Sequence, residues 1–504
     1  MTNHLFDAIR SRMPGLDQIF AKQDDGRTLT YGGLLELSAR LSQALVSCNI
    51  SPGDRVLLQA EKSLPALVLY LACVRAGAVF LPLNPSYTTA ELDYFLKDAE
   101  PGLVVCDPAR ESFASDQGFR TLTLDHAGHG SLMDLAQACP AEFCDANRDA
   151  NDLAAILYTS GTTGRSKGAM LTHENLLSNA QTLAEIWRFS SQDVLLHALP
   201  IYHSHGLFVA TNTVLMSGAS MIFLPRFDAD QVIKHLKDAT VMMGVPTFYT
   251  RLLNHPGLTQ EALRHMRLFI SGSAPLLAET HRQWQEQTGH AILERYGLTE
   301  TNMNTSNPYE GERRPGTVGF PLPGVDVRIT QAETGAMLPK GDIGMIEVKG
   351  PNLCHGYWRN PEKTQAEFRE DGFFITGDLG LVDQDGYVHI VGRAKDLVIT
   401  GGFNVYPKEV EGEIDALEGV LESAVFGLAH PDFGEGVTAA VVLDGTVELS
   451  QEDVLAALQD RLAKFKLPKR ILIVPELPRN AMGKVQKNLL KERWADAYTL
   501  ESKA

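Results

Sequence analysis

Short apolar runs alternate with helix-like segments over roughly the first 300 residues, and this alternation predicts a layered α/β fold. Turn-forming residues separate the two kinds of segment. The predicted helices span residues 31–48, 63–76 and 90–98, and the predicted strands span 55–59, 79–83, 102–106, 220–224, 241–245, 268–271 and 291–294. Strands that alternate with helices form largely parallel sheets. We therefore expect two related α/β halves in this region.

Beyond Gly316 the strands become shorter and are separated by Gly and Pro, which predicts a small β-barrel-like unit. These strands span residues 325–330, 344–348, 373–376 and 387–391. Residues 392–407 combine charges with glycines, as is typical of a linker. An α+β pattern follows, with helices at 407–416 and 451–462 and strands at 423–428, 438–443 and 470–474. We predict a large body at residues 1–393 and a small α+β domain at 394–504.

The run LAAIL at residues 153–157 leads into YTSGTTGRSKG at 158–168, which has the composition of a turn that binds phosphate. Gly161 and Gly164 allow positive φ and close approach of the backbone to a ligand. Lys167 adds a cation, and hydroxyl groups come from Thr159, Ser160, Thr162 and Thr163. We expect a buried strand that opens into this turn.

Two short patterns inside the turn suggest other chemistry and fit less well. The P-loop pattern starting at Gly161 fails at two positions, because Ser166 replaces its second glycine and Gly168 its Ser or Thr. Residues 164–168 satisfy G-x-S-x-G, but a nucleophile elbow places its serine directly after a strand. Here six small polar residues intervene. A hydrolase is therefore the weaker interpretation.

Composition limits the class of partner. The chain has 504 residues and a formal net charge of -17, whereas proteins that bind nucleic acid or a membrane surface usually present a basic face. Its six cysteines include no C-x-x-C pair, which favours reduced thiols and no cysteine-bound metal. The N-terminus carries Asp7, Arg10 and Arg12 where a signal peptide needs an apolar core. We expect a cytoplasmic protein without nucleic-acid or membrane partners.

Four further segments carry more Gly, charge and aromatic residues than packing requires. They are ERYGLTE at 294–300, ITGDLG at 375–380, GRAKD at 392–396 and PRNAMGK at 478–484. With YTSGTTGRSKG, and in this order, they resemble the motifs of the adenylate-forming superfamily of acyl-CoA synthetases, luciferases and peptide-synthetase adenylation domains. The resemblance covers nearly the whole chain. It implies a ligase that joins a carboxylate to the α-phosphate of ATP and then passes the acyl group to the thiol of coenzyme A.

The resemblance assigns roles to motif residues. Glu300 would bind Mg²⁺, as a single carboxylate beside phosphates commonly does, and Thr299 would contact the α-phosphate. Tyr296 would stack on adenine, and Asp378 with Arg393 would bind ribose. On sequence alone the tyrosine and the aspartate also fit a core residue and a turn residue. The wider nucleotide site would comprise Thr159, Ser160, Gly161, Thr162, Thr163, Gly164, Lys167, Ser273, Ala274, Pro275 and Glu294.

Lys484 resembles the lysine that this superfamily carries on a mobile C-terminal domain, although a loop lysine is usually a solvated charge. It would stabilise charge on the α-phosphate and on the attacking carboxylate, so that the domain must close for adenylation. The domain would then rotate at Lys395, and Gly401 and Gly402 would face the pantetheine tunnel. Relatives are silenced by acetylation of the corresponding lysine, which makes a lysine acetyltransferase and deacetylase candidate partners. A monomer and a homodimer both fit the sequence.

The resemblance places the acyl pocket at His203, Ser204, Leu207, Ser271, Arg295 and Met303, with His203 also among the catalytic residues. Relatives specific for long-chain or aromatic acids carry a small or neutral residue at the position of Arg295. A substrate with a second carboxylate would compensate a buried guanidinium through two parallel hydrogen bonds. The segments LPIYHSHGLF and ERYGLTETNMNTSNPY are similar to malonyl-CoA synthetases. We expect malonate as substrate, with methylmalonate used more slowly.

Three alternatives stay open. Arg295 could form a structural ion pair with Glu294 or another acid, and the substrate would then be another short or medium-chain carboxylic acid. His203 and His205 could be a zinc pair, although no third ligand is evident nearby. The chain could bind adenylates without turnover, but this predicts erosion of the motif residues, and they are intact.

Overall fold

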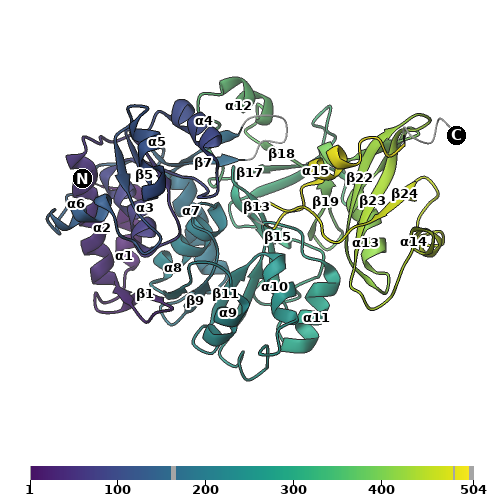
Figure 1. Ribbon diagram of the computed structural model, residues 1–504, viewed down its shortest axis with the longest axis horizontal. Helices are drawn as coiled ribbons and strands as arrows, with labels where there is room; N and C mark the ends of the chain where they lie inside the picture. The colour runs from purple at the N-terminus through teal and green to yellow at the C-terminus, as the bar shows by residue number, and fades with distance from the viewer. Residues whose placement is uncertain (1, 160–165, 481–482, 499–504) are drawn as a thin grey trace.

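The computed structural model describes residues 2–159, 166–480 and 483–498, and its large body contains two mainly parallel sheets (Figure 1). The first sheet has the strand order β6-β5-β3-β4-β7-β8, and within it only β7 and β8 pair antiparallel. Its strands are β3 (Arg55–Gln59), β4 (Val79–Pro82), β5 (Leu103–Cys106), β6 (Thr121–Thr123), β7 (Leu153–Thr159) and β8 (Lys167–Thr172). This sheet confirms the parallel α/β architecture expected for the N-terminal residues.

The second sheet has the order β15-β14-β13-β12-β11-β9-β10-β1-β2 and is parallel except at its two edges. Its strands are β1 (Ile19–Gln23), β2 (Thr28–Thr30), β9 (Val194–His197), β10 (Ser220–Phe223), β11 (Val241–Gly244), β12 (Leu268–Ser271), β13 (Leu293–Leu298), β14 (Asn302–Ser306) and β15 (Phe320–Pro321). Strand β13 starts two residues later than the start predicted at residue 291 and continues through the motif residues up to Leu298. The motif therefore belongs to a strand.

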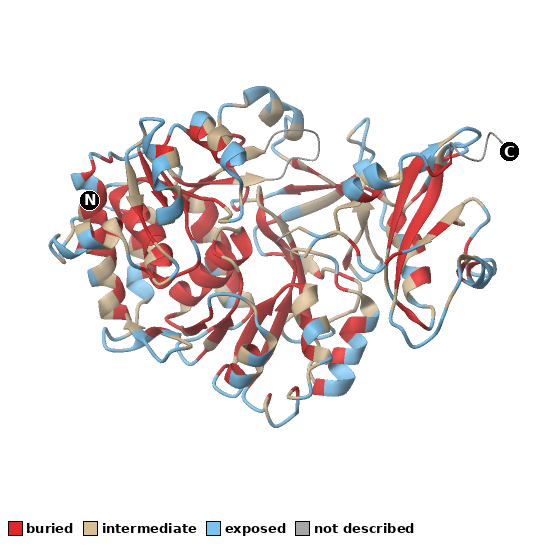
Figure 2. Ribbon diagram, viewed as in Figure 1, coloured by how far each residue is buried: buried red, intermediate tan, exposed pale blue. Residues whose placement is uncertain are grey.

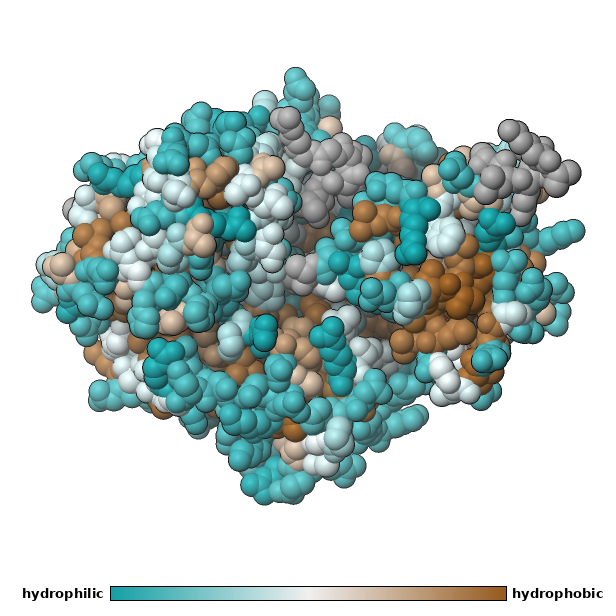
Figure 3. All heavy atoms as spheres, viewed as in Figure 1, coloured by the Kyte–Doolittle hydropathy of each residue, from teal (hydrophilic) through white to brown (hydrophobic). Residues whose placement is uncertain are grey.

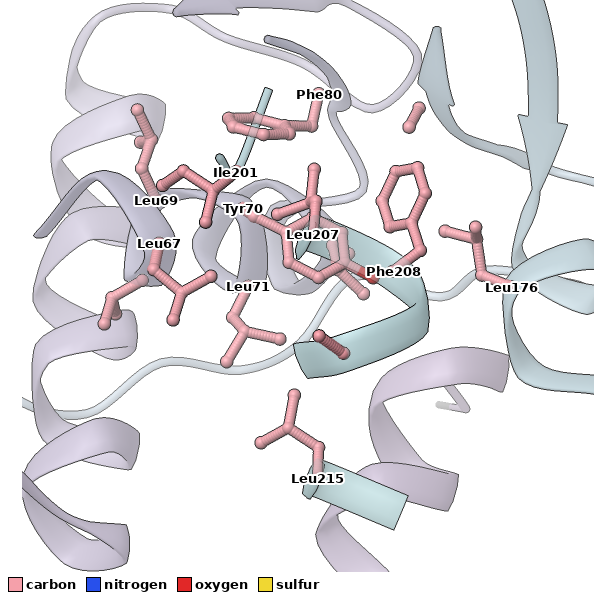
Figure 4. Packing of buried hydrophobic residues seen from close by; sticks show 14 of the residues in the cluster. Leu67, Leu69, Tyr70, Leu71, Phe80, Leu176, Ile201, Leu207, Phe208 and Leu215 are labelled. Carbon is pink, nitrogen blue, oxygen red and sulfur yellow. The ribbon is translucent and has the colours of Figure 1, made fainter. Parts of the chain in front are cut away.

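Helix α3 (Leu64–Ala76) joins the two sheets into one body. It is apolar on nearly all sides, as expected of a fully buried helix, and it ends at Gly77, which has φ 74°. Helix α2 (Tyr31–Ser47) packs along it. Figure 4 shows leucines of α3 facing Leu207, Phe208 and Leu215 of the segment formed by the π-helix η2 (His205–Ala210) and α8 (Thr211–Ser217). This buried core fixes η2, which is relevant because π-helical turns are frequent at functional sites.

Some of the remaining helices pack on one of the two sheets, whereas α1 and α7 contact α8. Helices α9, α10 and α11 pack on the second sheet around a cluster that includes Trp284, and α4 packs on the first sheet. Their bounds are α1 (His4–Arg12), α4 (Thr89–Ala99), α5 (Glu111–Ser115), α6 (Ser131–Gln137), α7 (His173–Ile186), α9 (Ala229–Leu236), α10 (Pro246–Leu253), α11 (Ala278–Thr288) and α12 (Pro361–Glu367). Among the described residues, no helix is both long and apolar enough to cross a membrane.

Two further sheets follow in the C-terminal part of the chain. Strands β16 (Asp326–Thr330), β17 (Gly344–Lys349), β18 (Phe374–Val382) and β19 (Val388–Arg393) form an antiparallel row. The last sheet contains β20 (Val398–Thr400), β21 (Phe403–Val405), β22 (Val420–His430), β23 (Gly434–Leu443) and β24 (Arg470–Ile473). Figure 2 shows that its long strands are buried, and α13 (Pro407–Asp415), α14 (Gln451–Leu458) and α15 (Lys487–Arg493) pack against them.

The segment predicted as a linker is largely structured, so that prediction was wrong for most of residues 392–407. Strands β20 and β21 form a hairpin there, and Thr400 pairs with Gly434 of β23. Between β19 and β20 lies only the short turn η3 (Ala394–Asp396) with Leu397. The glycines that looked like linker residues serve the hairpin, because Gly401 and Gly402 have φ values of 56° and 82°.

The molecular surface is mainly polar on the face shown in Figure 3, with apolar side chains gathered over the C-terminal sheet. Several large apolar side chains are strongly exposed in this part of the described chain: Ile399, Phe403, Leu421, Phe433, Val447, Ile473 and Leu489.

Candidate functional site

Tyr296, Asp378 and Arg393 come together where β13 meets the antiparallel row. The Tyr296 hydroxyl donates to Oδ2 of Asp378 at 2.5 Å, and Nε of Arg393 lies 2.9 Å from Oδ1 of the same carboxylate. Asp378 and Arg393 are register partners across β18 and β19. Burial, with the Asp378 charge as the next cause, raises the pKa of Tyr296 far above its ordinary value, so its hydroxyl remains a donor. The three residues that sequence comparison assigned to adenine and ribose are thus neighbours.

The phosphate-turn motif lies between two antiparallel strands. Thr159 ends β7 and pairs with Lys167, the first residue of β8, whereas Ser160, Gly161, Thr162, Thr163 and Gly164 lie outside the described residues. A strand-to-strand connection differs from both the P-loop and the nucleophile elbow, which lead from a strand into a helix. The geometry therefore disfavours the P-loop and hydrolase interpretations.

Glu300 belongs to a network of acids and cations that links it to Lys167. The Tyr357 hydroxyl donates to Oε1 of Glu300 at 3.0 Å and also contacts Glu367 closely. Glu367 lies 3.5 Å from Nζ of Lys167 and 2.6 Å from Nζ of Lys363. Burial raises the pKa of Glu300, because its charged form has lost water. A cation beside this carboxylate would stabilise its charge.

Sequence reasoning missed Tyr357 and Glu367. Tyr357 lies in the segment GYWRNPEKT, whose glycine and adjacent aromatic residues could have marked it. Glu367 ends α12 within a segment of ordinary surface composition, so no comparable signal was present.

The loop after β12 holds Ser273 in an unusual conformation beside η2. Ser273 has φ 70°, which is uncommon for a residue other than glycine, and its hydroxyl lies 3.2 Å from Nδ1 of His205. Ala274 is half-buried and Pro275 is exposed. Thr299, between β13 and β14, is also half-buried. The nucleotide roles of these four residues remain predictions.

Among the residues that the structure describes, the buried Arg295 has no counter-ion. Only 3% of the residue's surface is exposed to solvent, and its Nε and Nη2 atoms have no hydrogen-bond partner among the described residues. The guanidinium lies over Gly272, where an added Cβ would be 2.4 Å from its Cζ atom. The neighbouring Glu294 instead faces His281, with Oε1 3.3 Å from Nδ1, as alternation along a strand requires. Within the described chain, the alternative of an Arg295–Glu294 ion pair is therefore wrong.

Of the other predicted acyl-pocket residues, His203 feels the charge of this guanidinium, and Ser271 adjoins Gly272, over which the guanidinium lies. Burial, followed by the Arg295 charge, lowers the pKa of His203 to about 4. Ser271 precedes Gly272 and has a buried hydroxyl without a partner in the described residues, while Ser204 is buried at the start of η2. Leu207 and Met303 belong to the main apolar core. The described residues contain no group of three potential metal ligands, which argues against a zinc site at this histidine.

Lys484 is brought to the body from the C-terminal sheet. Lys484 is exposed on the surface of the domain contact, and desolvation of its ammonium group, followed by the charge of Arg393, lowers its pKa, with Asp378 acting in the opposite direction. Gly483 packs on Thr247 at the start of α10, where an added Cβ would lie 3.1 Å from Oγ1. Figure 1 shows the yellow chain segment before α15 passing from the C-terminal sheet toward the body. Lys484 therefore shares one electrostatic environment with Asp378 and Arg393.

Of the predicted hinge and tunnel residues, Lys395 lies close enough to this contact for its charge to lower the pKa of Lys484. Lys395 is in η3, directly between β19 and the C-terminal sheet. Gly401 and Gly402 form the exposed turn between β20 and β21.

Known proteins resemble this chain over almost its full length. The AMP-binding enzyme description matches residues 9–358, and the AMP-binding enzyme C-terminal domain matches residues 409–484. The chain belongs to the AMP-binding enzyme family. A malonate–CoA ligase of Arabidopsis thaliana is 35% identical over 94% of this chain and 86% of its own length. A feruloyl-CoA synthase of Amycolatopsis is also 35% identical, over 94% of this chain and 96% of its own.

Two solved structures extend the comparison to the arrangement of the domains. ATP-bound MatB from Rhodopseudomonas palustris is 59% identical, with a TM-score of 0.97 over 99% of this chain and 100% of that one. The apo structure of the same protein, with the same coverage, gives a TM-score of 0.86. The present arrangement is therefore closer to the ATP-bound form.

As an AMP-forming acid–thiol ligase of this family, the protein uses ATP, Mg²⁺ and coenzyme A. The residues present fit the metal. Glu300 is a half-buried carboxylate whose raised pKa reflects lost hydration, and magnesium among phosphates commonly needs only one or two protein carboxylates. Glu300 would hold the ion, which would neutralise phosphate charge.

Proposed function

We propose that the protein ligates malonate, and methylmalonate more slowly, to coenzyme A through an acyl-adenylate. The observation that carries the proposal is the buried Arg295 guanidinium, which has no counter-ion among the described residues. A buried charge is costly unless it is paired and hydrogen-bonded. A dicarboxylate would supply the missing partner and leave its second carboxylate free to react. The similarity to malonate–CoA ligases supports this choice of diacid.

The groups around the guanidinium suit one carboxylate. Burial lowers the pKa of Arg295 to about 9, so it is still mainly charged at neutral pH. His203, with a pKa of about 4, is neutral there and can donate one hydrogen bond without adding a second positive charge. The unpartnered hydroxyl of Ser271 is a further donor. Three donor groups, the guanidinium, the imidazole and the hydroxyl, together with a single positive charge, complement one carboxylate group.

In the proposed reaction the free carboxylate oxygen bonds to the α-phosphorus of ATP and the bond to pyrophosphate breaks. The sulfur of coenzyme A then bonds to the acyl carbon, its proton goes to solvent, and AMP leaves. Lys167 and the threonine-rich turn would bind the outer phosphates, and Asp378 would bind ribose. Lys484 would stabilise negative charge between the α-phosphate and the carboxylate, because its charge is directed into the same environment as Asp378.

We further propose that residues 1–393 form the body and 394–504 a lid that turns at Lys395 between the two reactions. The TM-score of 0.97 with ATP-bound MatB, against 0.86 with the apo form, supports assigning the present arrangement to adenylation. Rotation would withdraw Lys484 and bring Gly401 and Gly402 toward the site. Acetylation of Lys484 would remove its charge, so a lysine acetyltransferase and a deacetylase are the proposed regulators.

An Arg295→Met variant tests the choice of substrate. Pyrophosphate release is measured with malonate, methylmalonate, acetate, butyrate and 4-coumarate for the wild type and the variant. We expect kcat/KM for malonate to fall about a hundredfold, since a bidentate charged contact is lost, while butyrate use is kept or improved. Arg313→Met is the matched control, because the Arg313 guanidinium is satisfied by backbone carbonyls, including that of Ala291 at 2.8 Å.

A wild-type preference for a monocarboxylate would contradict the proposal and support the alternative of another short or medium-chain acid. The same conclusion would follow if Arg295→Met reduced the use of malonate and butyrate equally, because the arginine would then act only on structure.

A further inference from the structure

The described residues around Lys484, 479–480 and 483–487, are joined by internal bonds and are here called the hairpin. Arg479 and Val485 form an antiparallel bridge at its base. The Asn480 amide donates to the Lys484 carbonyl at 2.9 Å, and the Lys484 amide donates to Oδ1 of Asn480 at 3.0 Å. Nη1 of Arg479 donates to the Gly483 carbonyl at 2.6 Å. The backbone of Lys484 is therefore tied to the base of the hairpin.

Two ion pairs attach this hairpin to the C-terminal sheet and helix. On its N-terminal side, Nη2 of Arg479 pairs closely with Oε2 of Glu422 on β22. On its C-terminal side, Nζ of Lys487 lies 2.6 Å from Oε1 of Glu411 on α13, which also accepts the Val425 amide at 2.8 Å. The four side chains are only 17% to 29% exposed. Such partly desolvated pairs with fixed geometry are stronger than surface pairs.

Lys484 itself has no comparable attraction to the body before substrate binds. No carboxylate in the described chain forms an ion pair with it, and the charges of Arg393 and Lys395, which lower its pKa, are opposed by those of Asp378 and Asp396. These opposing charges give the ammonium group no single partner. A lysine side chain is a flexible stem, so the position of its ammonium group depends on where its backbone is fixed. The two ion pairs provide this attachment on both sides of the lysine.

We propose that Arg479 with Glu422, and Lys487 with Glu411, are positioning residues that hold Lys484 at the adenylation site. This inference rests on the proposed function, specifically on the role of Lys484 in the first reaction. Among the described residues, the hydrogen bonds and ion pairs of these four side chains lie within the C-terminal domain. They act through the backbone of the hairpin, so their loss affects the reaction that needs Lys484 and spares the other.

The test separates the two half-reactions in the full-length enzyme. Adenylation is followed by malonate-dependent exchange of pyrophosphate into ATP, and thioester formation by the consumption of supplied malonyl-adenylate with coenzyme A. We expect Glu422→Gln to reduce exchange about tenfold and to change thioester formation less than twofold. The charge-swapped double variant Glu422→Arg with Arg479→Glu should recover part of the exchange activity, because it restores an ion pair at the same place.

Glu413→Gln is the control, because Glu413 lies on α13, as Glu411 does, but pairs with Arg461 at 3.6 Å and not with a residue of the hairpin. It should leave both half-reactions unchanged. Lys484→Ala tests the proposed role of the lysine separately from the proposed role of the two ion pairs. If it retains exchange, the proposed role of Lys484 fails and this inference fails with it.

If Lys484→Ala abolishes exchange while Glu422→Gln leaves it intact, only the positioning proposal is overturned. Equal loss of both half-reactions in Glu422→Gln, without recovery in the swapped variant, would also overturn it, because the pair would then serve folding alone.

Discussion

At the scale of single residues, the site holds a positive charge in place before its partner arrives. Arg295 is buried, and two titratable neighbours, His203 and His205, are kept neutral by burial and by the arginine itself. This arrangement stores unfavourable desolvation that a bound carboxylate would relieve. The guanidinium can occupy this position only because Gly272 presents no side chain there.

A Gly272→Ala variant should displace Arg295 without unfolding the chain. The added Cβ would lie 2.4 Å from Cζ and Nη1 of Arg295, and the end of a flexible side chain can move away from it. We expect kcat/KM for malonate to fall at least about tenfold while that for butyrate changes little. Steady-state kinetics with both acids measures this, and Gly15→Ala, whose Cβ would meet nothing within 4 Å, is the control. Parallel losses for both acids would indicate general damage to the pocket.

Single residues were predictable where a motif fixed their position. The motifs identified Tyr296, Asp378 and Arg393, and the structure places them in contact. Glu367 could not be found in this way, because its connection to Lys167 spans 200 positions and its own segment has no distinctive pattern. Long-range partners of this kind depend on tertiary packing, which a single sequence does not display.

At the scale of elements, the end of α13 carries a destabilising charge. Asp415 closes this helix, where the macrodipole disfavours a carboxylate, and its Oδ1 has no hydrogen-bond partner in the described chain. Burial, with the charges of Glu411 and Glu422 adding to it, raises the pKa of Asp415 to about 7 from an ordinary 3.8. The folded protein therefore prefers this carboxyl in its protonated form.

The stability contributed by Asp415 should therefore fall as pH rises. Because its folded pKa lies above the unfolded value, that contribution is complete below about pH 4 and is lost by the time pH passes about 7. Asp415→Asn removes the penalty, so at pH 8 it should stabilise the C-terminal domain on the order of 1 kcal/mol, a value reduced for partial exposure. At pH 4 it should have little effect. Thermal unfolding at the two pH values, with hydrogen exchange in α13, measures the difference.

Asp444→Asn provides a control of opposite sign. The pKa of Asp444 is lowered, chiefly by hydrogen bonds from Thr446, so its neutralisation should not raise the Tm at pH 8. A pH-independent effect of Asp415→Asn would show that its carboxyl does not titrate between these pH values.

Elements were predicted best where apolar runs were bounded by turn residues, as for β3 and β12, whose predicted and observed bounds coincide. Prediction failed where strands carry polar functional residues. Strand β13 includes Glu294, Arg295 and Tyr296, and charged positions conceal the strand pattern although neighbouring strands bury them. The hairpin of β20 and β21 resembled a linker for a different reason. Its two glycines form the turn of the hairpin, whereas glycines close together in a sequence are also typical of linkers.

At the scale of the whole molecule, the proposed lid movement would make the position of the C-terminal domain decide which of the two reactions the site performs. Its contacts with the body include Gly483 on Thr247 and the packing of α13 beside β19. A second contact is electrostatic: Lys408, in the first turn of α13, feels the charge of the buried Glu294 on β13. Burial lowers the pKa of Lys408, and Glu294 with Glu411 counteracts this effect. The attraction between Lys408 and Glu294 therefore stabilises the arrangement in which the C-terminal domain lies on the body.

A Lys408→Met variant should shift the lid away from its adenylation position. Methionine keeps most of the apolar stem but removes the attraction to Glu294, which in a partly buried setting is worth on the order of 1 kcal/mol. We expect a fewfold loss of malonate-dependent pyrophosphate exchange, a higher KM for ATP, and unchanged or faster thioester formation from supplied malonyl-adenylate.

The lid position itself can be measured with spin labels on Cys144, an exposed thiol of the body, and on Cys introduced at Glu452 of α14, after Cys139 is replaced by Ser. In Lys408→Met the distance population of the ATP-bound wild type should decrease, and saturating ATP with malonate should restore much of it, because the ligands contribute their own attraction to the closed form. Lys464→Met, which removes an exposed charge from the same domain, should leave the distances unchanged. If Lys408→Met slowed exchange without altering the distances, Lys408 would act on the chemistry of the site, and the link between its charge and the lid position would be refuted.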